Sequence, residues 1–503
     1  MAIADLYCGR DLGDDRRCYG RKLPNLDACL RHASRAERDS FYSGIRTGQI
    51  NPPVGYLTEL TFDEGLFEEI KDLLSSVPST VDFRHSVFDC TADFTGLRFG
   101  HADFTGARFM YSANFRNVIF EGRADFTDVR FGTHGQSFAG ARFDDEVTFA
   151  CSPTATDEVR RTMALHLSAA TLAKGARFDG RHFRHQRPGD QFDVNLNDAQ
   201  AGGNLIFIDV VCDGTIVLDR LIPTAPITVL APTGSRVSLV ELILTEPLTI
   251  TARVYGQPDA GPAAAPTQLV SLVNATLEAP LTIGDGIALT DCRLIGATGL
   301  DHLRVTGVDP MWPVLRHRRV IADELRMWHA PGKQPHGAEP LAPDPRQLES
   351  VYRQLRAALE ATRAAPAAAD FYYGEMEMRR LSCRPRQFEK SLLMIYKLIS
   401  GYGLRAYRAI ATYLVLLLTI TALLRYRTDW FVADRTAAAG SAGLAFDQFW
   451  DVFAIAARAS VNVLSAVTTG LTAAGTMLFI LLRLAGPATI ALAILALRAR
   501  VQR

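Results

Sequence analysis

The sequence predicts a solenoid of short β-strands, preceded by a small cysteine-rich module and followed by helices that enter a membrane. Three observations support this prediction. Phenylalanine recurs every five or six residues for most of the stretch 83–149. Three of the eight cysteines lie within the first 29 residues, and the last hundred residues are far more apolar than the remainder.

The composition excludes several classes of protein. Lys plus Arg and Asp plus Glu both number 54 among 503 residues, so the net charge is zero, unlike that of most nucleic-acid-binding proteins or acidic DNA mimics. Eight cysteines are too few for a disulfide scaffold. The N-terminus carries acidic residues where a signal peptide needs an apolar core, which favours a cytosolic start. We therefore expect no nucleic-acid partner.

The N-terminal module, residues 1–78, contains a candidate metal site and two stretches with helical spacing of apolar residues. The candidate ligands, in the pattern C-x9-C-x10-C-x2-H, are Cys8, Cys18, Cys29 and His32. Three thiolates and an imidazole complete a tetrahedral set for structural zinc, and clustered cysteines in a reducing cytosol are more often metal ligands than disulfides. The alternative is three unrelated small residues near a terminus.

Residues 79–308 are expected to form the solenoid. A helix does not explain a step of five, because at 100° per residue the phenylalanines would spread around the whole cylinder. In a strand, residues i and i−2 share a face, so the Ala or Val that usually lies two residues before each Phe points inward with it. Repeated units of this kind wrap into a coil. The expected core contains Phe83, Phe88, Phe94, Phe99, Phe104, Phe109, Phe115, Phe120, Phe126 and Phe131.

These units resemble those of the pentapeptide-repeat family, whose motif is A-(D/N)-(F/L)-x-x. The motif occurs as Ala92-Asp93-Phe94, Ala102-Asp103-Phe104, Ala113-Asn114-Phe115 and Ala124-Asp125-Phe126. The resemblance implies a right-handed, four-sided β-helix with about twenty residues per coil. We expect a helical excursion at 151–175, after which short β-rich runs continue the solenoid.

The remaining sequence predicts cytoplasmic juxtamembrane helices at 309–403 and a transmembrane region at 404–503. Apolar spans are expected at about 407–426 and 475–497. Residues 446–470 form an amphipathic segment that either re-enters the membrane, spans it or lies on it. Two spans place both termini on one side, so we expect a multi-pass protein of the cytoplasmic membrane with both termini in the cytoplasm.

The juxtamembrane helices carry basic residues that would attract anionic lipid. These are Arg379, Arg380, Arg384, Arg386, Lys390 and Lys397. Nearby, Glu375 and Glu377 straddle a helix rather than face each other, so a paired-carboxylate catalytic site is not expected. We expect them to pair with neighbouring arginines or solvent, although Arg380 fits poorly with Glu377. The motifs of common hydrolases, NTPases and dinucleotide enzymes are absent from the sequence, which predicts a protein that is not an enzyme.

The C-terminal part also resembles the tail of membrane-associated pentapeptide-repeat proteins of actinobacteria. The resemblance rests on Tyr352-Arg-Gln-Leu-Arg, on the stretch from Phe371 to Arg380, and on Ser400-Gly-Tyr-Gly-Leu-Arg405. Together with the N-terminal Cys/His box it spans nearly the whole chain. It implies an architecture but little about function.

Two functions follow as hypotheses. The first is a scaffold or receptor whose cytosolic solenoid docks a protein partner, or a large assembly such as a contractile injection system particle, to the membrane. The second is a gated pore, since span, half-helix and span follow one another as in two-span channels, although the turn is unlike T-V-G-Y-G. The pore candidates are Arg458, Asn462, Thr468, Thr469 and Arg483. Association into a homo-oligomer is compatible with both.

Overall fold

The computed structural model describes residues 6–501 apart from 12–16, 51–54, 77–78, 133–135, 163, 184–191, 213, 232–234, 253–268, 285–286, 288, 306–319, 330–342, 362–364, 385–386, 427–448 and 462–472. The chain divides into two compact units, Met1–Pro343 and Asp344–Arg503.

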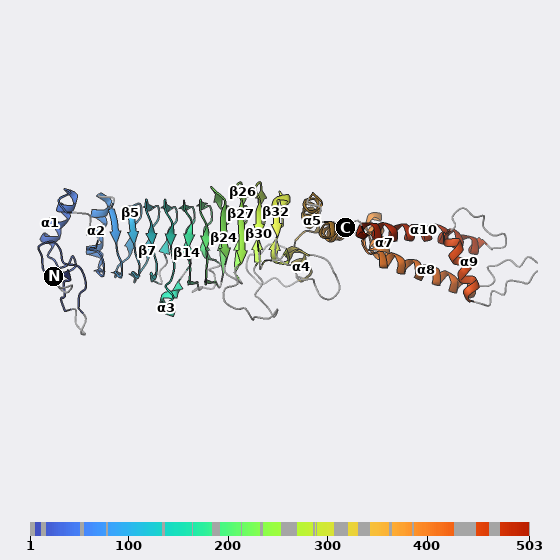
Figure 1. Cartoon of the computed structure of the whole chain (residues 1–503), viewed down its shortest axis with the longest axis horizontal. Coiled ribbons are helices and arrows are strands. Elements are labelled where there is room, and N and C mark those ends of the chain that lie inside the picture. The colour runs from blue at the N-terminus through green and yellow to red at the C-terminus, as the bar shows by residue number, and fades with distance from the viewer. Residues whose placement is uncertain are drawn as a thin grey trace, which may run out of the picture. The chain divides into compact units, whose positions relative to one another are not determined.

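The first unit is a parallel β-solenoid in which short strands stack coil upon coil (Figure 1). The strands lie on four sides, of which two consist of one long ladder each and two consist of two shorter ladders each. One ladder contains β2 (Ser79–Asp82), β5 (Arg98–Asp103), β9 (Ala124–Asp125), β12 (Val147–Thr148), β16 (Ala176–Arg177), β20 (Leu205–Ile206), β24 (Ile227–Ala231), β27 (Leu248–Ala252), β30 (Leu281–Ile283) and β32 (Leu303–Val305). A second contains β4 (Ala92–Asp93), β7 (Ala113–Asn114), β10 (Gln136–Ser137), β14 (Leu165–His166), β18 (Phe192–Asn195), β22 (Thr215–Val217), β25 (Arg236–Ser238), β28 (Leu269–Ser271) and β31 (Cys292–Arg293).

The other two sides are built from shorter ladders. One begins with β5 and continues through β8 (Ile119–Phe120), β11 (Arg142–Phe143), β15 (Thr171–Leu172), β19 (Gln200–Ala201) and β23 (Ile222–Pro223), and a separate pair is β26 (Ile243–Leu244) with β29 (Thr276–Leu277). The last side consists of β1 (Thr61–Phe62), β3 (Val87–Phe88) and β6 (Arg108–Phe109), and of β13 (Arg161–Thr162), β17 (His182–Phe183) and β21 (Val211–Cys212).

The repeat motif explains both the core and the corners. Nine of the ten predicted core phenylalanines are buried, and Phe131 is half-buried. Each ring stacks on the ring one coil away: Phe104 lies 5.0 Å from Phe126, and Phe115 lies 4.7 Å from Phe138, between centroids. Such aromatic contacts contribute about 0.5–1.5 kcal/mol each beyond the area they bury. The prediction of a phenylalanine core is therefore confirmed.

The Asp or Asn of the motif stabilises the turn that follows it. The Oδ1 atom of Asp103 accepts the N–H of Thr105 at 2.9 Å, and Asp125 accepts that of Thr127 at 3.0 Å. Gly106, two residues after its Phe, has φ +68°, a conformation that glycine adopts without steric cost. The coil thus turns through local hydrogen bonds at a fixed distance after each Phe.

Coil length departs from the expected twenty residues. Ala102 pairs with Ala124, so this coil has 22 residues, whereas Val147 pairs with Ala176, 29 residues on. The longer coil contains the excursion predicted to be helical over 151–175. That prediction is wrong except for one turn, α3 (Asp157–Arg160), because alternate apolar residues from Leu165 onward are buried as in the other coils.

The excursion interrupts the turn that closes every earlier coil. In a regular coil the third residue after the Phe closes the turn, as when the Ala107 N–H donates to the Phe104 carbonyl oxygen. After Phe149 the chain leaves toward α3, and the Ser152 N–H donates to Asp128 Oδ1 instead. The carbonyl oxygen of Phe149 therefore lacks its usual backbone donor.

Arg181 supplies the missing donors from the next coil. Its side chain is 1% exposed, and within the described residues every hydrogen bond of its guanidinium goes to a backbone carbonyl oxygen. The acceptors are Phe149 at 2.7 Å, Val129 at 2.8 Å, Phe126 at 3.0 Å and Val159 at 3.3 Å. One charged side chain thereby joins three coils and the end of α3.

Both ends of the solenoid are covered. At the N-terminal end, α1 (Arg35–Arg46) and α2 (Glu64–Ser76) precede the repeats, and Phe67 of α2 packs edge-on against Phe94 at 5.1 Å. At the other end, α4 (Ala322–His329) lies on the last coil, where buried Asp323 accepts the Leu294 N–H at 2.6 Å. Covered ends prevent a sheet from adding strands of another chain.

The second unit is helical. A hairpin of α5 (Pro345–Ala361) and α6 (Ala365–Ser382) is followed by α7 (Phe388–Ser400). The remaining helices are α8 (Ala406–Tyr426), α9 (Phe449–Val461) and α10 (Ala473–Val501). Two of them, α8 over Ala406–Leu423 and α10 over Thr476–Leu495, are long and apolar enough to cross a membrane.

We expect Arg181→Met to lower the free energy of unfolding by about 3 kcal/mol, because the buried carbonyl oxygens of Phe149 and Val129 lose the guanidinium donor at roughly 1–3 kcal/mol each. Denaturant unfolding of the full chain in detergent, followed by circular dichroism, measures the change. Arg177→Met is the matched control, since its ion pair with Asp179 lies at the surface and contributes under about 1 kcal/mol. Equal effects of the two substitutions would contradict the role given to Arg181.

Candidate functional site

The four predicted metal ligands come together at the N-terminal end of the first unit. Cys8 and Cys18 lie on facing segments, where the Cys8 N–H donates to the Gly20 carbonyl oxygen and the Gly9 N–H to that of Cys18. Cys29 and His32 lie in one turn, closed by the His32 N–H and the Cys29 carbonyl oxygen at 2.9 Å. The two pairs face each other.

The donor atoms are spaced as a tetrahedral metal site requires. The Nδ1 atom of His32 lies 3.4 Å from both the Cys8 and the Cys29 sulfur atoms, and the Cys18 and Cys29 sulfur atoms are 3.6 Å apart. All four donors lie within 4.8 Å of one another. Bonds of about 2.3 Å to sulfur and 2.0–2.1 Å to nitrogen give tetrahedral edges of this size. The cluster could therefore hold a metal ion, and four protein ligands would leave no position for substrate.

The cluster rests directly on the first coil. A Cβ atom on Gly20 would lie 2.6 Å from Leu60 Cδ2 and 3.1 Å from the Cys29 sulfur, so only glycine fits between the ligands and the solenoid. Leu60 belongs to the coil, since its carbonyl oxygen accepts the Val87 N–H. A hydrogen bond from the Cys29 thiol lowers the pKa of Cys18, while the same contact raises the pKa of Cys29.

Half of the predicted lipid-binding basic residues instead pair with carboxylates of the same unit. Arg379 bonds Glu389, while Arg380 and Lys397 both bond Glu377. Arg384 is exposed, Lys390 is half-buried, and Arg386 lies outside the described residues. The pairing of Arg380 with Glu377, which the sequence argued against, is an (i, i+3) contact at 2.8 Å.

Glu377 is the centre of a charge cluster between three elements. Its Oε1 atom accepts from Arg380 at 2.8 Å and from Lys397 of α7 at 2.7 Å, and its Oε2 atom accepts the Tyr402 hydroxyl at 2.8 Å. Tyr402 has φ +61° in the connection from α7 to α8. Burial alone would raise the pKa of Glu377, but these hydrogen bonds lower it to about 2. Glu375, by contrast, bonds Arg353 and Arg356 of α5.

Helix α7 has the reverse of the usual amphipathic arrangement. Lys397 faces inward to Glu377, whereas the apolar residues Phe388, Leu392, Ile395 and Leu398 are 52–82% exposed. In a water-soluble helix the apolar face is the buried one. The outer face of α7 therefore suits an apolar environment rather than water.

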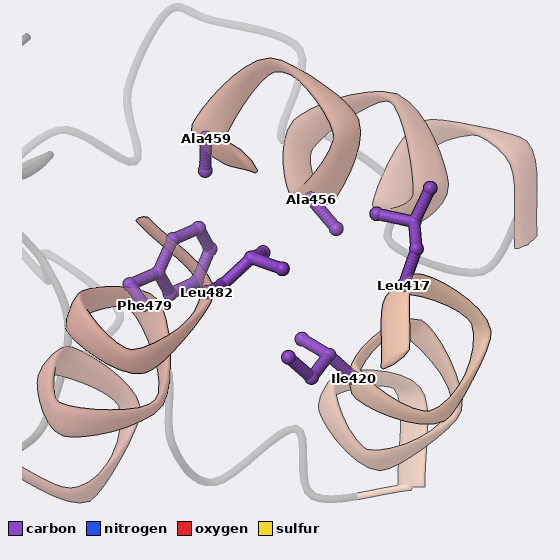
Figure 2. Packing of buried hydrophobic residues seen from close by; sticks show 6 residues of the cluster. All are labelled: Leu417, Ile420, Ala456, Ala459, Phe479 and Leu482. Carbon is purple, nitrogen blue, oxygen red and sulfur yellow. The ribbon is translucent and has the colours of Figure 1, made fainter. Parts of the chain in front are cut away.

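The structure describes two of the five candidate pore residues. Arg458 is exposed on α9, and Arg483 is half-buried on α10. Asn462, Thr468 and Thr469 lie outside the described residues. Apolar side chains of α8, α9 and α10 meet in one cluster, in which those of Leu417, Ala456 and Leu482 point toward one another (Figure 2).

For the metal cluster we expect the purified protein to bind one equivalent of cobalt(II) with the intense sulfur-to-metal absorption of a thiolate site. Cys29→Ser should weaken cobalt binding and reduce that absorption, because only two of the three thiolates remain. Cys383→Ser is the control, since this cysteine lies in the other unit. An unchanged cobalt spectrum in Cys29→Ser would rule out the site.

For the charge cluster we expect a pH dependence with a defined sign. Because the pKa of Glu377 is depressed from 4.5 to about 2, its stabilisation is present above pH 4.5 and is lost as the pH falls toward 2. Glu377→Gln should remove about 2–3 kcal/mol at pH 6 and much less at pH 2.5. Thermal unfolding in detergent at both pH values measures this.

The control for that measurement is Glu389→Gln, which breaks the exposed pair with Arg379 and should change stability by under about 1 kcal/mol. If Glu377→Gln lowered the free energy of unfolding equally at pH 6 and pH 2.5, the depressed pKa of Glu377 would be contradicted.

Comparison with known proteins identifies one segment. Residues 104–150 match the family model described as pentapeptide repeats (nine copies). The chain has no match among curated proteins or among solved structures. The matched residues include the stacked rings from Phe104 to Phe149, so this part of the solenoid consists of pentapeptide repeats. The Cys/His cluster and the two apolar helices lie outside it.

Proposed function

We propose that the protein is a non-enzymatic, membrane-anchored scaffold or receptor whose solenoid docks a protein partner or a large assembly to the cytoplasmic membrane. One observation carries the proposal. The chain contains both a solenoid whose interior is filled by side chains and two helices of membrane length that expose apolar side chains. The two parts suit recognition and attachment respectively.

The solenoid favours recognition through its outer surface. Stacked rings occupy the interior of the coils, and repeat proteins generally bind along extended surfaces. On one side Arg220 pairs with Asp198 at 2.6 Å and with Glu241 at 3.3 Å. Ile222 follows Arg220 by two residues and is 49% exposed. Ile243 follows Glu241 by two residues and is 60% exposed. Apolar side chains beside balanced charges suit a protein partner better than a nucleic acid.

In this proposal the N-terminal metal is a structural zinc ion. Zinc prefers three thiolates and an imidazole in a closed tetrahedron, and such sites stabilise small modules that have little core of their own. Cys8, Cys18, Cys29 and His32 would bind it. The ion would hold the module against the first coil through the close contact at Gly20.

The membrane is the proposed environment of the second unit. Helices α8 and α10 would span it, and both termini would lie in the cytoplasm. The exposed apolar face of α7 would lie at the lipid surface, which is how interfacial helices bind. Arg384 and Lys390 remain as basic contacts for anionic headgroups.

The test compares the full chain with a chain that ends at residue 403, both affinity-purified from detergent extracts of the source cells. We expect the same partner proteins with both chains, but recovery in the membrane fraction only for the full chain. A partner set that depends on 404–503 would contradict docking through the solenoid. Recovery of the full chain in the soluble fraction would contradict membrane attachment.

A further inference from the structure

The start of α8 carries two arginines whose charges no described residue neutralises. Arg405 directly precedes α8, and Arg408 lies in its first turn, at one end of the apolar stretch Ala406–Leu423. Both side chains are half-buried, and within the described residues neither guanidinium has a carboxylate partner. They differ in this respect from Arg380, which pairs with Glu377.

The acidic side chains of the second unit that the structure does not describe are also separated from these arginines. They belong to Asp429, Asp434, Asp447 and Asp451. All four follow α8 in the chain and precede α10. If both helices span the membrane, these carboxylates lie on the opposite side of it from Arg408. Within its own unit the arginine pair is therefore open to an anion from outside.

Contacts with aromatic residues hold the pair in place without using up its donors. The Arg405 guanidinium lies over the Tyr373 ring of α6, 5.3 Å from its centroid, and Tyr373 packs edge-on against Tyr402 at 5.1 Å. Arg405 also donates to the Tyr407 hydroxyl at 3.4 Å. A cation–π contact consumes none of the five N–H donors of a guanidinium. The remaining donors can therefore bind oxygen atoms of a ligand.

An exposed apolar surface continues from the arginines along α8. Arg405 and Arg408 are three residues apart and are neighbours at this end of the helix. Ala411 and Val415 follow on the side of Arg408, at spacings of three and four, and both are exposed, Val415 by 62%. A basic end followed by an apolar side has the same order as the phosphate and the acyl chains of a phospholipid.

The chemistry of the pair favours a phosphate that carries net negative charge. Arginine binds phosphate through parallel N–H···O bonds, and the Tyr407 hydroxyl, which accepts from Arg405, can donate its own proton to a phosphate oxygen. A zwitterionic headgroup would also bring an ammonium group toward two positive charges. Basic sites beside membrane helices bind acidic headgroups in this way.

We propose that Arg405, Arg408 and the Tyr407 hydroxyl bind the phosphate of one anionic phospholipid, whose acyl chains lie along the exposed side of α8. The helix itself gives no reason for the two arginines, because positive charge at a helix N-terminus is unfavourable to the helix dipole. A bound phosphate would compensate that charge. This inference rests on the membrane embedding in the proposed function and gives the anchor a preference for one class of lipid.

The test is native mass spectrometry of the full chain in detergent, titrated separately with dioleoylphosphatidylglycerol, dioleoylphosphatidylcholine and inorganic phosphate. We expect one phosphatidylglycerol to bind at least about tenfold more tightly than phosphatidylcholine, and inorganic phosphate to bind far more weakly than either lipid. Arg408→Gln and Arg405→Gln should each weaken phosphatidylglycerol binding about tenfold, because charge-assisted hydrogen bonds are lost. Circular dichroism checks that both variants keep the helix content of the wild type.

The matched control is Arg346→Gln, which removes the same charge from an exposed position of α5 and should bind phosphatidylglycerol as the wild type does. Equal affinity for the two lipids, wild-type affinity in both Arg408→Gln and Arg405→Gln, or an equal loss in the control would overturn the site. Inorganic phosphate that binds as tightly as phosphatidylglycerol would overturn the lipid as its ligand. Each of these results leaves the anchor intact if the protein resists extraction by alkaline carbonate, whereas extraction would overturn both proposals.

Discussion

The stacking of one phenylalanine ring on the next, coil after coil, is the interaction on which the solenoid depends. Parallel strands of two residues make few hydrogen bonds, and such short strands are not stable alone. In the coils up to Phe207 the rings provide the apolar core that joins the strands, with centroids 4.5–5.7 Å apart in each stack. In the later coils buried aliphatic side chains such as those of Leu239 and Leu272 form the core instead. Because the strand spacing of about 4.8 Å lies within the range of centroid separations that offset-stacked rings prefer, backbone and side chains share one repeat distance.

Departures from the repeat require compensation, and Arg181 shows how. When the coil bulges outward after Phe149, the carbonyl oxygen of this residue loses the turn N–H that would otherwise bond it. An arginine is suited to this position because its guanidinium carries five donors in a fixed geometry, enough for several carbonyl oxygens at once. The cost of burying its charge is offset by those hydrogen bonds. The coil can therefore carry an insertion without interrupting the stack, since Phe149 and Phe178 still lie 5.4 Å apart.

In the second unit the usual distribution of charged and apolar side chains is reversed. Charged groups are gathered inside, around Glu377 and Glu375, while apolar side chains are exposed on α7, α8 and α10. In water this arrangement would be unfavourable, but in lipid it places each group in the better solvent. Arg458, a charged residue exposed on α9, is an exception to this pattern.

The sequence by itself determined the features that depend on local period and composition. The five-residue spacing predicts the phenylalanine stack, two apolar runs predict the long helices, and the Cys/His pattern predicts a cluster that the fold assembles. Tertiary structure decided what depends on contacts between distant residues. No local pattern predicts the burial of Arg181, because its acceptors lie 22 to 55 residues away along the chain. The partners of Glu377 likewise follow only from how the helices pack, because ion-pair geometry is not encoded in a local pattern.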